Sequence, residues 1–315
     1  MSNNEIQKTQ EPQTIPDDAL EIIIKTFDCS KEDVKDIYAL EKGMTNSSFV
    51  FNVNSEKYII RVPGKGTRQL INRKQEEQVY KVISNYDLCY NPIYINAQNG
   101  YKITKFIEGI RPCNPTDTAD LMRCMDKLRY FHSLHLEVSH TFDVFKQIDF
   151  YESLRGNTPS LYCDYENTKK NVLSLKNYID NSQKNICLCH IDSVPDNFLF
   201  YTDSSGEEKL QLTDWEYAGM QDSHIDIAMF CVYSMYTKEQ CDRLIDIYFK
   251  GNCDTATRAK IYCYICVCGL LWSNWCEYKH ILGIDFGEYS LKQYEFAKEF
   301  YRHAMNIISQ ENICQ

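Results

Sequence analysis

The stretch that decides the fold is HIDSVPDN at residues 190–197, an H-x-D-x₄-N string. It lies between two short apolar runs, ICLC at 186–189 and FLFY at 198–201, and DWE follows at 214–216. Phosphoryl transfer needs one carboxylate to accept the proton of the attacking hydroxyl. It also needs an amide and a second carboxylate to hold Mg²⁺ against the nucleotide phosphates. The string therefore predicts a loop that handles phosphate and metal.

Each polar residue of this region has a predicted role. Asp192 is expected to act as the base, and Asn197 and Asp214 are expected to bind Mg²⁺. Protein kinases have the same Asp-to-Asn spacing in the catalytic loop, and a later Asp that holds metal. His190 completes the predicted catalytic set and is expected to brace the loop rather than react. The alternative is a solvated turn, but the order of the two motifs behind a β-rich segment favours catalysis.

The elements around this loop predict an α+β fold of two lobes. Residues 16–110 are expected to form the smaller, nucleotide-binding N-lobe, an antiparallel β-sheet with one inserted helix. Residues 111–315 are expected to form the larger, mostly helical C-lobe with the catalytic loop, metal site and acceptor pocket. The polar residues 1–15 are expected to be a disordered leader. Apolar periodicity predicts helices at 17–27, 68–83, 116–136, 165–179, 225–236, 238–250, 256–280 and 289–308, and strands at 36–40, 48–53, 57–62, 92–96, 101–106, 186–189, 198–201 and 209–213.

Composition narrows the possible partners and the compartment. The 315 residues include 44 acidic and 34 basic side chains, and the formal net charge of −10 argues against nucleic acid as a partner. The longest nearly unbroken apolar run, 261–272, is shorter than the roughly 20 residues needed to span a bilayer. The N-terminus lacks the apolar core of a signal peptide. These features predict a cytoplasmic protein without a transmembrane segment.

The 15 cysteines are expected to be reduced structural thiols. Disulfide scaffolds are short and loop-rich, whereas this chain is long and has an ordinary apolar content. Neither tight group, at 187–189 and 263–268, has the paired spacing of a zinc site.

The predicted N-lobe contains candidates for contact with ATP phosphates. The loop GMTN at 43–46 is expected to lie over the phosphates through Gly43, Thr45 and Asn46. It lacks a G-x-G-x-x-G or Walker pattern, so alone it is weak evidence. Arg61 ends a strand where a kinase places its phosphate-binding lysine, and Glu76 on the next helix is expected to pair with it. The alternative for Arg61 is an ordinary charge at a strand edge.

The segment between the two predicted lobes is expected to bind the adenine. Phe106 ends the last predicted N-lobe strand, and Ile107 and Glu108 follow it and precede Gly109. As a hinge, this segment would offer its backbone hydrogen-bonding groups to the adenine ring.

Several of these motifs together resemble the choline/ethanolamine kinase family. They are GMTN, RVPGKGT at 61–67, INRKQE at 71–76, the catalytic string and DWEYAG at 214–219. The sequence is most similar to the bacterial Lic-type choline kinases, within the aminoglycoside-phosphotransferase-like kinases, and the resemblance runs from about residue 42 to 301. The resemblance implies a protein-kinase-like bilobal fold. It also implies transfer of the ATP γ-phosphate, with Mg²⁺, to choline first and ethanolamine second, giving phosphocholine and ADP.

The acceptor would be a small cationic amino alcohol. A quaternary ammonium has no N–H donor, so aromatic faces and nearby carboxylates must bind it. Trp272 and Trp275 share one helix face, and the resemblance places cage aromatics in this helix, followed by a segment like GIDFGEY at 283–289. Core packing is the alternative for the tryptophans. The expected acceptor residues are Glu216, Tyr217, Asp226, Tyr233, Trp272 and Trp275.

Two departures from the family affect the acceptor rather than the catalytic residues. Residues 229–236, MFCVYSMY, contain no acidic residue, whereas relatives usually carry one in this helix. Some relatives also have an extra tryptophan near Gly269. Choline, ethanolamine and other amines therefore stay open as acceptors.

Two other functions are alternatives to this kinase activity. An aminoglycoside or other small-molecule phosphotransferase would need a carboxylate-rich acceptor pocket. A catalytically inactive, ligand-binding kinase-like protein would lack Asp192, Asn197 or Asp214, and all three are present. The sequence leaves open whether the protein is a monomer or a homodimer, and whether the product enters phospholipid or a surface glycan.

Overall fold

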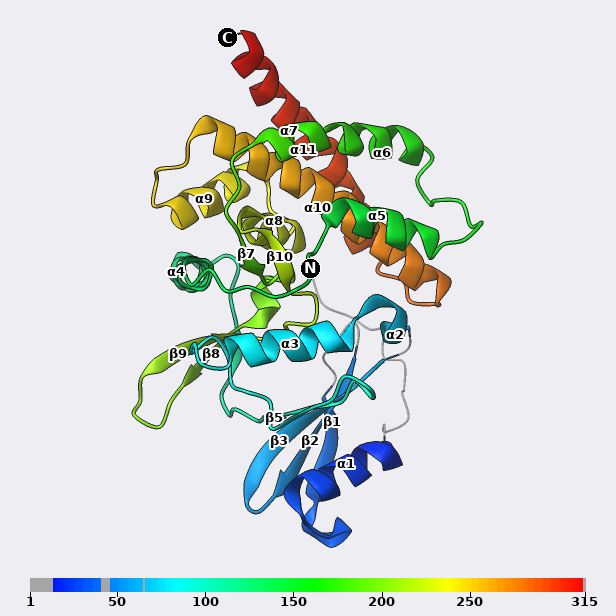
Figure 1. Ribbon diagram of the computed structural model, residues 1–315, viewed down its shortest axis with the longest axis vertical. Helices are drawn as coiled ribbons and strands as arrows, with labels where there is room; N and C mark the ends of the chain where they lie inside the picture. The colour runs from blue at the N-terminus through cyan, green and yellow to red at the C-terminus, as the bar shows by residue number, and fades with distance from the viewer. Residues whose placement is uncertain (1–13, 41–45, 65, 314–315) are drawn as a thin grey trace, which may run out of the picture. The chain divides into compact units, whose positions relative to one another are not determined.

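The computed structural model describes residues 14–40, 46–64 and 66–313 (Figure 1). The chain divides into two compact units. The first contains residues up to Tyr80 together with 90–108, and the second contains 81–89 and the chain from Gly109 onward. Most of the predicted leader, residues 1–13, lies outside the described residues. The assignment of nucleotide binding to 16–110 and of catalysis to 111–315 stays a prediction.

The first unit is built on an antiparallel sheet. Its strand order is β1-β2-β3-β5-β4. Asn54 and Ser55, with φ of 53° and 65°, form the tight turn of the β2–β3 hairpin, whose strands match those predicted at 48–53 and 57–62. The strands are β1 (Lys35–Leu40), β2 (Ser47–Val53), β3 (Glu56–Val62), β4 (Tyr94–Ile95) and β5 (Lys102–Lys105).

Helix α1 (Asp17–Phe27) covers one face of this sheet, as Figure 1 shows. Its apolar face buries Ala19, Leu20 and Ile23 against inward-facing residues of the sheet such as Phe51 and Ile60. The helix ends at Asp28, whose left-handed φ of 48° turns the chain away. An amphipathic helix on one sheet face gives this small unit its own apolar core.

The helix predicted at 68–83 is instead two helices, α2 (Thr67–Leu70) and α3 (Arg73–Ile83). Ile71 is extended, with φ −116° and ψ 125°. The Asn72 side chain then accepts the backbone N–H groups of Lys74 and Gln75, at 3.2 and 3.4 Å. An asparagine that caps N–H groups starts a new helix, and apolar periodicity alone does not detect this restart.

The second unit is mostly helical and contains two small sheets. Strand β10 pairs with β7 in one sheet, and the other has the order β6-β8-β9. The strands are β6 (Arg111–Pro112), β7 (Ile186–Cys189), β8 (Phe198–Thr202), β9 (Glu208–Leu212) and β10 (Gly219–Asp222). The helices are α4 (Thr118–Ser133), α5 (Val144–Ser153), α6 (Tyr165–Ser174), α7 (Lys176–Asn181), α8 (His224–Tyr233), α9 (Lys238–Phe249), α10 (Thr255–Ile281) and α11 (Glu288–Ile313).

Helix α10 is the centre of the second unit and is buried along nearly its whole length. It packs against α5, α8 and α11 (Figure 1). Gly269 allows the closest approach to α11, since a Cβ there would lie 2.7 Å from the Gln293 carbonyl oxygen and 2.8 Å from the Ala297 nitrogen. A helix surrounded in this way is buried on every side.

Most predicted elements of the second unit agree with the structure to within a few residues. The helix predicted at 165–179 is divided at Leu175 into α6 and α7. Helix α5 and strands β6 and β10 were not predicted. Among the described helices, none combines the length and the apolar character that crossing a bilayer requires.

Candidate active site

The catalytic string forms the connection between β7 and β8 in the second unit. Its C-terminal part is the 3₁₀ turn η2 (Pro195–Asn197). The Asn197 side-chain nitrogen donates to the Asp192 carbonyl oxygen at 2.8 Å and to its carboxylate Oδ2 at 3.0 Å. The Thr213 nitrogen donates to the Asn197 carbonyl oxygen at 2.9 Å. The structure therefore links the expected base, the expected metal ligand Asn197 and the segment that leads to Asp214.

The backbone of this loop is strained next to the expected base. Ile191 has φ of 68°, a left-handed conformation that is rare for a β-branched residue. Asp226 stabilises it: Oδ1 accepts the Ile191 N–H at 2.7 Å, and Oδ2 accepts the His190 N–H at 2.9 Å. Strain of this kind persists only where the surroundings fix it, and the buried Asp226 carboxylate provides that constraint.

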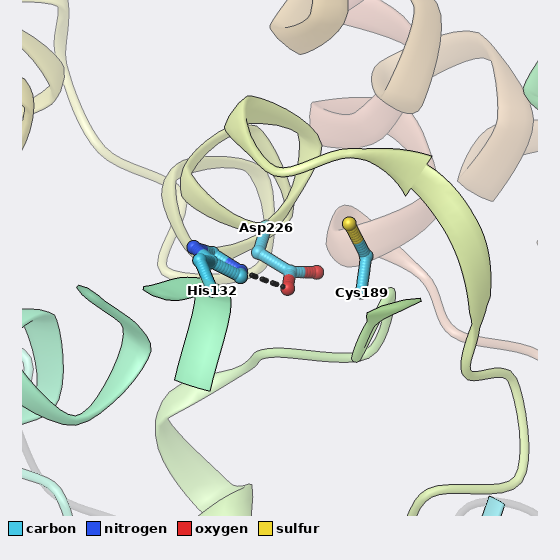
Figure 2. Close-up of side chains that lie close together, drawn as sticks. All are labelled: His132, Cys189 and Asp226. Carbon is cyan, nitrogen blue, oxygen red and sulfur yellow. Dashed lines mark hydrogen bonds and ion pairs between the residues drawn. The ribbon is translucent and has the colours of Figure 1, made fainter. Parts of the chain in front are cut away.

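The position of Asp226 differs from the predicted one. Its side chain is 0% exposed, and Figure 2 shows its carboxylate facing His132, which bonds Oδ2 at 2.9 Å. His132, Cys189 and Asp226 offer possible metal-ligand atoms within 4.8 Å of one another. The carboxylate oxygens, however, already accept N–H groups from the loop and the imidazole. Asp226 therefore faces the catalytic loop and not an acceptor.

His190 is buried and holds the loop to the segment before Asp214. Its Nε2 lies 2.8 Å from the Thr213 carbonyl oxygen, so Nε2 is the donor, and its ring packs on Trp215 at 4.5 Å. Burial lowers the pKa of His190. The buried imidazole thus connects the loop to the segment that precedes Asp214.

Three carboxylates, from Asp192, Asp214 and Glu216, interact electrostatically. Burial, and then the charges of Asp214 and Glu216, raise the pKa of Asp192 to about 8. Asp214 has φ of 64°, a second left-handed residue in the site. Like charges at close range disfavour simultaneous ionisation, so the site is poised to accept a cation or a proton.

A continuous series of aromatic rings lies beside these carboxylates. Trp272 and Trp275 on α10 meet edge to face at 5.8 Å, and Tyr217 meets Trp272 at the same distance. Burial first, and then the charges of Asp196 and Asp192, raise the pKa of the Tyr233 hydroxyl. The aromatic series, in order of contact, is Tyr217, Trp272, Trp275, Phe286, Tyr289 and Tyr233, with neighbouring centroids 5.1 to 6.2 Å apart.

Three residues that border this site were not assigned from the sequence. The Tyr151 ring, from the unpredicted helix α5, is fully buried, and its hydroxyl lies near that of Tyr217. Tyr289 belongs to a segment that the resemblance indicated only as a whole. The buried Lys279 ammonium lies 5.2 Å from the Trp275 ring centroid, and burial lowers its pKa while Glu216 opposes that shift. The sequence signal that could have identified Tyr151 is Asp143, which caps the N-terminus of α5, the helix that contains Tyr151.

In the first unit, the predicted Arg61–Glu76 pair is present. The two Arg61 amino groups bind the two Glu76 oxygens at 2.6 and 2.8 Å, and Arg73 and Lys102 also approach this carboxylate, at 2.7 and 3.5 Å. Although burial alone would raise it, the charges of Arg61, Lys102 and Arg73 hold the pKa of Glu76 well below its ordinary value. The guanidinium is therefore held rigidly at the end of β3.

The other predicted nucleotide residues are described in part. Gly43 and Thr45 lie outside the described residues, whereas the Asn46 side-chain oxygen accepts Arg73 at 3.2 Å. The Phe106 nitrogen donates to the Lys57 carbonyl oxygen at 3.0 Å, which extends the pairing next to β3.

The two remaining hinge residues lie at the end of the first unit. Ile107 is half-buried, and the exposed Glu108 carboxylate pairs with the Lys57 ammonium at 2.6 Å. The Glu108 side chain is thus engaged on the surface, and only its backbone is suited to the role expected of the hinge.

The fold and these two residue sets define a phosphotransferase of the protein-kinase-like class. The family model described as choline/ethanolamine kinase matches residues 37–265. The chain therefore belongs to the choline/ethanolamine kinase family, as its motifs indicated, and it is an enzyme of the kind that phosphorylates an alcohol group.

Individual relatives agree with this assignment. The chain is 29% identical over 273 residues to protein LicA of Haemophilus influenzae, covering 81% of this chain and 77% of that protein. It is 28% identical to the solved structure of choline kinase LicA from Streptococcus pneumoniae, with a TM-score of 0.77 over 90% of this chain and 98% of that one. Aminoglycoside phosphotransferase APH(4)-Ia, at 14% identity and TM-score 0.60, covers 90% of this chain and 98% of its own and shares the fold.

Proposed function

We propose that the protein transfers the γ-phosphoryl group of Mg²⁺-ATP to the hydroxyl of choline, with ethanolamine as the second acceptor. The hydroxyl oxygen forms a bond to the γ-phosphorus, the bond to the β–γ bridging oxygen breaks, and the hydroxyl proton passes to Asp192. The products are phosphocholine and ADP. The single observation that carries this proposal is the side-chain hydrogen bond from the Asn197 nitrogen to the Asp192 carboxylate at 3.0 Å, which holds the expected base beside the expected metal ligand.

The donor set around Asp192 suits Mg²⁺. Mg²⁺ prefers carboxylate and amide oxygens and is usually held by one or two protein groups plus substrate phosphates. Because Asn197 uses its side-chain nitrogen as a donor to Asp192, its amide oxygen remains as the ligand atom. Asp214 supplies the carboxylate. The ion would neutralise phosphate charge, while Asp192 orients the acceptor hydroxyl and takes its proton.

Arg61 is the proposed cation for the ATP phosphates. A guanidinium can hold phosphate oxygens bidentately, and the pair with Glu76 fixes its orientation. A similar solved structure, that of LicA, contains AMP. We assign Gly43, Thr45 and Asn46 to the phosphates as well.

The backbone of residues 106–108 is assigned to the adenine. These nucleotide contacts give the N-lobe, residues 16–110, its proposed role, and the C-lobe from 111 onward contributes the base, metal ligands and acceptor pocket. Because the reaction consumes ATP, we place the enzyme in the cytoplasm, as a monomer or a homodimer.

The aromatic series is the proposed binding site for the cationic head of the acceptor. Quaternary ammonium groups are recognised by aromatic faces. Trp272 contacts both Tyr217 and Trp275 in the series, and its indole N–H is directed to the Met229 sulfur at 3.0 Å. One face of Trp275 is already covered by the Lys279 ammonium. Tyr217, Trp272 and Tyr233 are therefore the principal acceptor contacts, Trp275 supports them, and Asp226 positions the catalytic loop instead.

The test is acceptor-dependent release of ADP by the purified protein with Mg²⁺-ATP. Choline, ethanolamine, an aminoglycoside and no acceptor are compared, and Asp192→Ala runs alongside to expose contaminating ATPase. We expect turnover with choline, less with ethanolamine and none with Asp192→Ala. ADP release with neither amine would contradict the acceptor assignment, and aminoglycoside-dependent release would support the rival phosphotransferase.

A further inference from the structure

Asp196 joins the catalytic loop to the aromatic series. It lies in η2, next to Asn197, and its Oδ2 accepts the hydroxyl of Tyr233 at 2.6 Å. The Tyr233 ring in turn contacts Tyr289, with centroids 6.1 Å apart. A carboxylate is thus hydrogen-bonded to Tyr233, the ring at one end of the series proposed to bind the acceptor.

Unlike Glu216 and Asp226, Asp196 has no basic side chain beside it among the residues that the structure describes. Glu216 has the buried Lys279 near it, and Asp226 is bonded by His132 and two backbone N–H groups. Within the described parts of the chain, no lysine, arginine or histidine pairs with Asp196. Its side chain is exposed, so a ligand can reach it.

The helix that presents Tyr233 offers no carboxylate of its own toward its C-terminal end. The sequence there, MFCVYSMY at 229–236, contains no acidic residue. Aromatic rings bind an ammonium group through their faces but cannot neutralise its full charge. Asp196 is therefore the carboxylate best placed to supply the opposite charge at the Tyr233 end of the series.

We propose that Asp196 determines specificity for a positively charged acceptor, acting on its cationic head by charge while the rings supply the apolar contact. This inference rests on the proposed function and concerns the same site. Because a quaternary ammonium donates no hydrogen bond, the attraction is Coulombic. It weakens with salt, since Asp196 is exposed. Loss of one such charge corresponds to about a tenfold change in affinity.

The experiment compares choline with 3,3-dimethylbutan-1-ol, in which carbon replaces the charged nitrogen and the shape is kept. Asp196→Asn is expected to raise the KM for choline about tenfold, with kcat and the KM for ATP nearly unchanged. Its kcat/KM for the neutral alcohol should equal that of the wild type. Asp203→Asn removes a half-buried acid from the turn between β8 and β9, and it is the matched control because it changes the net charge equally.

Salt dependence gives a second readout if the neutral alcohol is turned over too slowly. Added NaCl should raise the choline KM of the wild type and of Asp203→Asn more steeply than that of Asp196→Asn. Tyr233→Phe keeps the ring and removes the hydroxyl donor. It should raise the choline KM by less than Asp196→Asn does and preserve the steep salt dependence.

Several outcomes would overturn the inference. Equal losses for both acceptors, or a changed requirement for Mg²⁺, would mean that Asp196 positions the loop or the metal. An unchanged KM and salt slope would mean that it plays no part. A wild-type protein that is inactive with choline and ethanolamine would refute the proposed function, and this inference with it. An active wild type with an unaffected Asp196→Asn variant would refute this inference alone.

Discussion

Replacing Asp192 with asparagine should stabilise the metal-free protein, and more strongly at high pH. In the folded protein the pKa of Asp192 is about 8, against an ordinary value of 3.8. The folded state therefore keeps a proton that the unfolded state releases. By linkage, stability falls as pH rises from about 4 to about 8 and is constant above that. The asparagine side chain carries no charge in either state, so the variant lacks this loss.

The magnitude follows from the pH interval. Between pH 6 and pH 9, the free-energy cost of ionising Asp192 grows only up to about pH 8 and is constant above that. These two pH units, at about 1.4 kcal/mol each, amount to about 3 kcal/mol. The free energy of unfolding is measured by urea denaturation in EDTA for Asp192→Asn and for the wild type. The value for the variant minus that for the wild type should be about 3 kcal/mol larger at pH 9 than at pH 6. Asp203→Asn is the control, because the lowered pKa of Asp203 keeps it ionised across this range.

Mg²⁺ should reduce this pH dependence, because a cation held by Asn197 and Asp214 favours the ionised form of Asp192. The reasoning is refuted if the difference between Asp192→Asn and the wild type is the same at pH 6 and pH 9 in EDTA. It is also refuted if the Asp203→Asn control shows the same change.

Three further substitutions test the rest of the account. Glu76→Gln should lower the free energy of unfolding by about 3 to 5 kcal/mol and raise the KM for ATP, because the buried cations lose their carboxylate. The control Glu108→Gln, which removes an exposed ion pair, should lower it by less than about 1 kcal/mol. Asp226→Asn should lower kcat by about 10² or more while ATP still binds, because the strained loop loses charge-assisted hydrogen bonds; an unchanged kcat would contradict its positioning role. Trp272→Leu should raise the KM for choline about tenfold, and Trp272→Phe less; equal effects would mean that Trp272 only fills space.

The main features of the fold were predictable because they depend on local patterns. The β2–β3 hairpin follows from alternating apolar residues around Asn54 and Ser55, and the catalytic loop follows from its position between two apolar runs. The restart of a helix at Asn72 was missed because one capping side chain decides it. Helix α5 was missed because its ten residues, Val144–Ser153, form a short element whose cap, Asp143, was not read as a start.

The candidate site was predictable in its residue types and less so in their partners. Spacing identified Asp192 and Asn197, and a strand end identified Arg61. Asp226 was placed with the acceptor because a carboxylate near aromatic residues suits a cation. Its actual contacts, the backbone N–H groups of a strained loop, arise from tertiary packing and have no signature in the sequence. The link between Tyr233 and Asp196 likewise joins residues that are far apart along the chain.

The most direct measurement is single-turnover transfer of labelled γ-phosphate from ATP to choline by the wild type and by Asp192→Asn, with ATP affinity measured on both. The account predicts that phosphocholine forms with the wild type. It predicts about 10³-fold slower formation with Asp192→Asn at nearly unchanged ATP affinity, because the variant binds the substrates but lacks the base. Transfer by Asp192→Asn at a rate within about tenfold of the wild type would contradict the role of Asp192 on which the proposed mechanism rests.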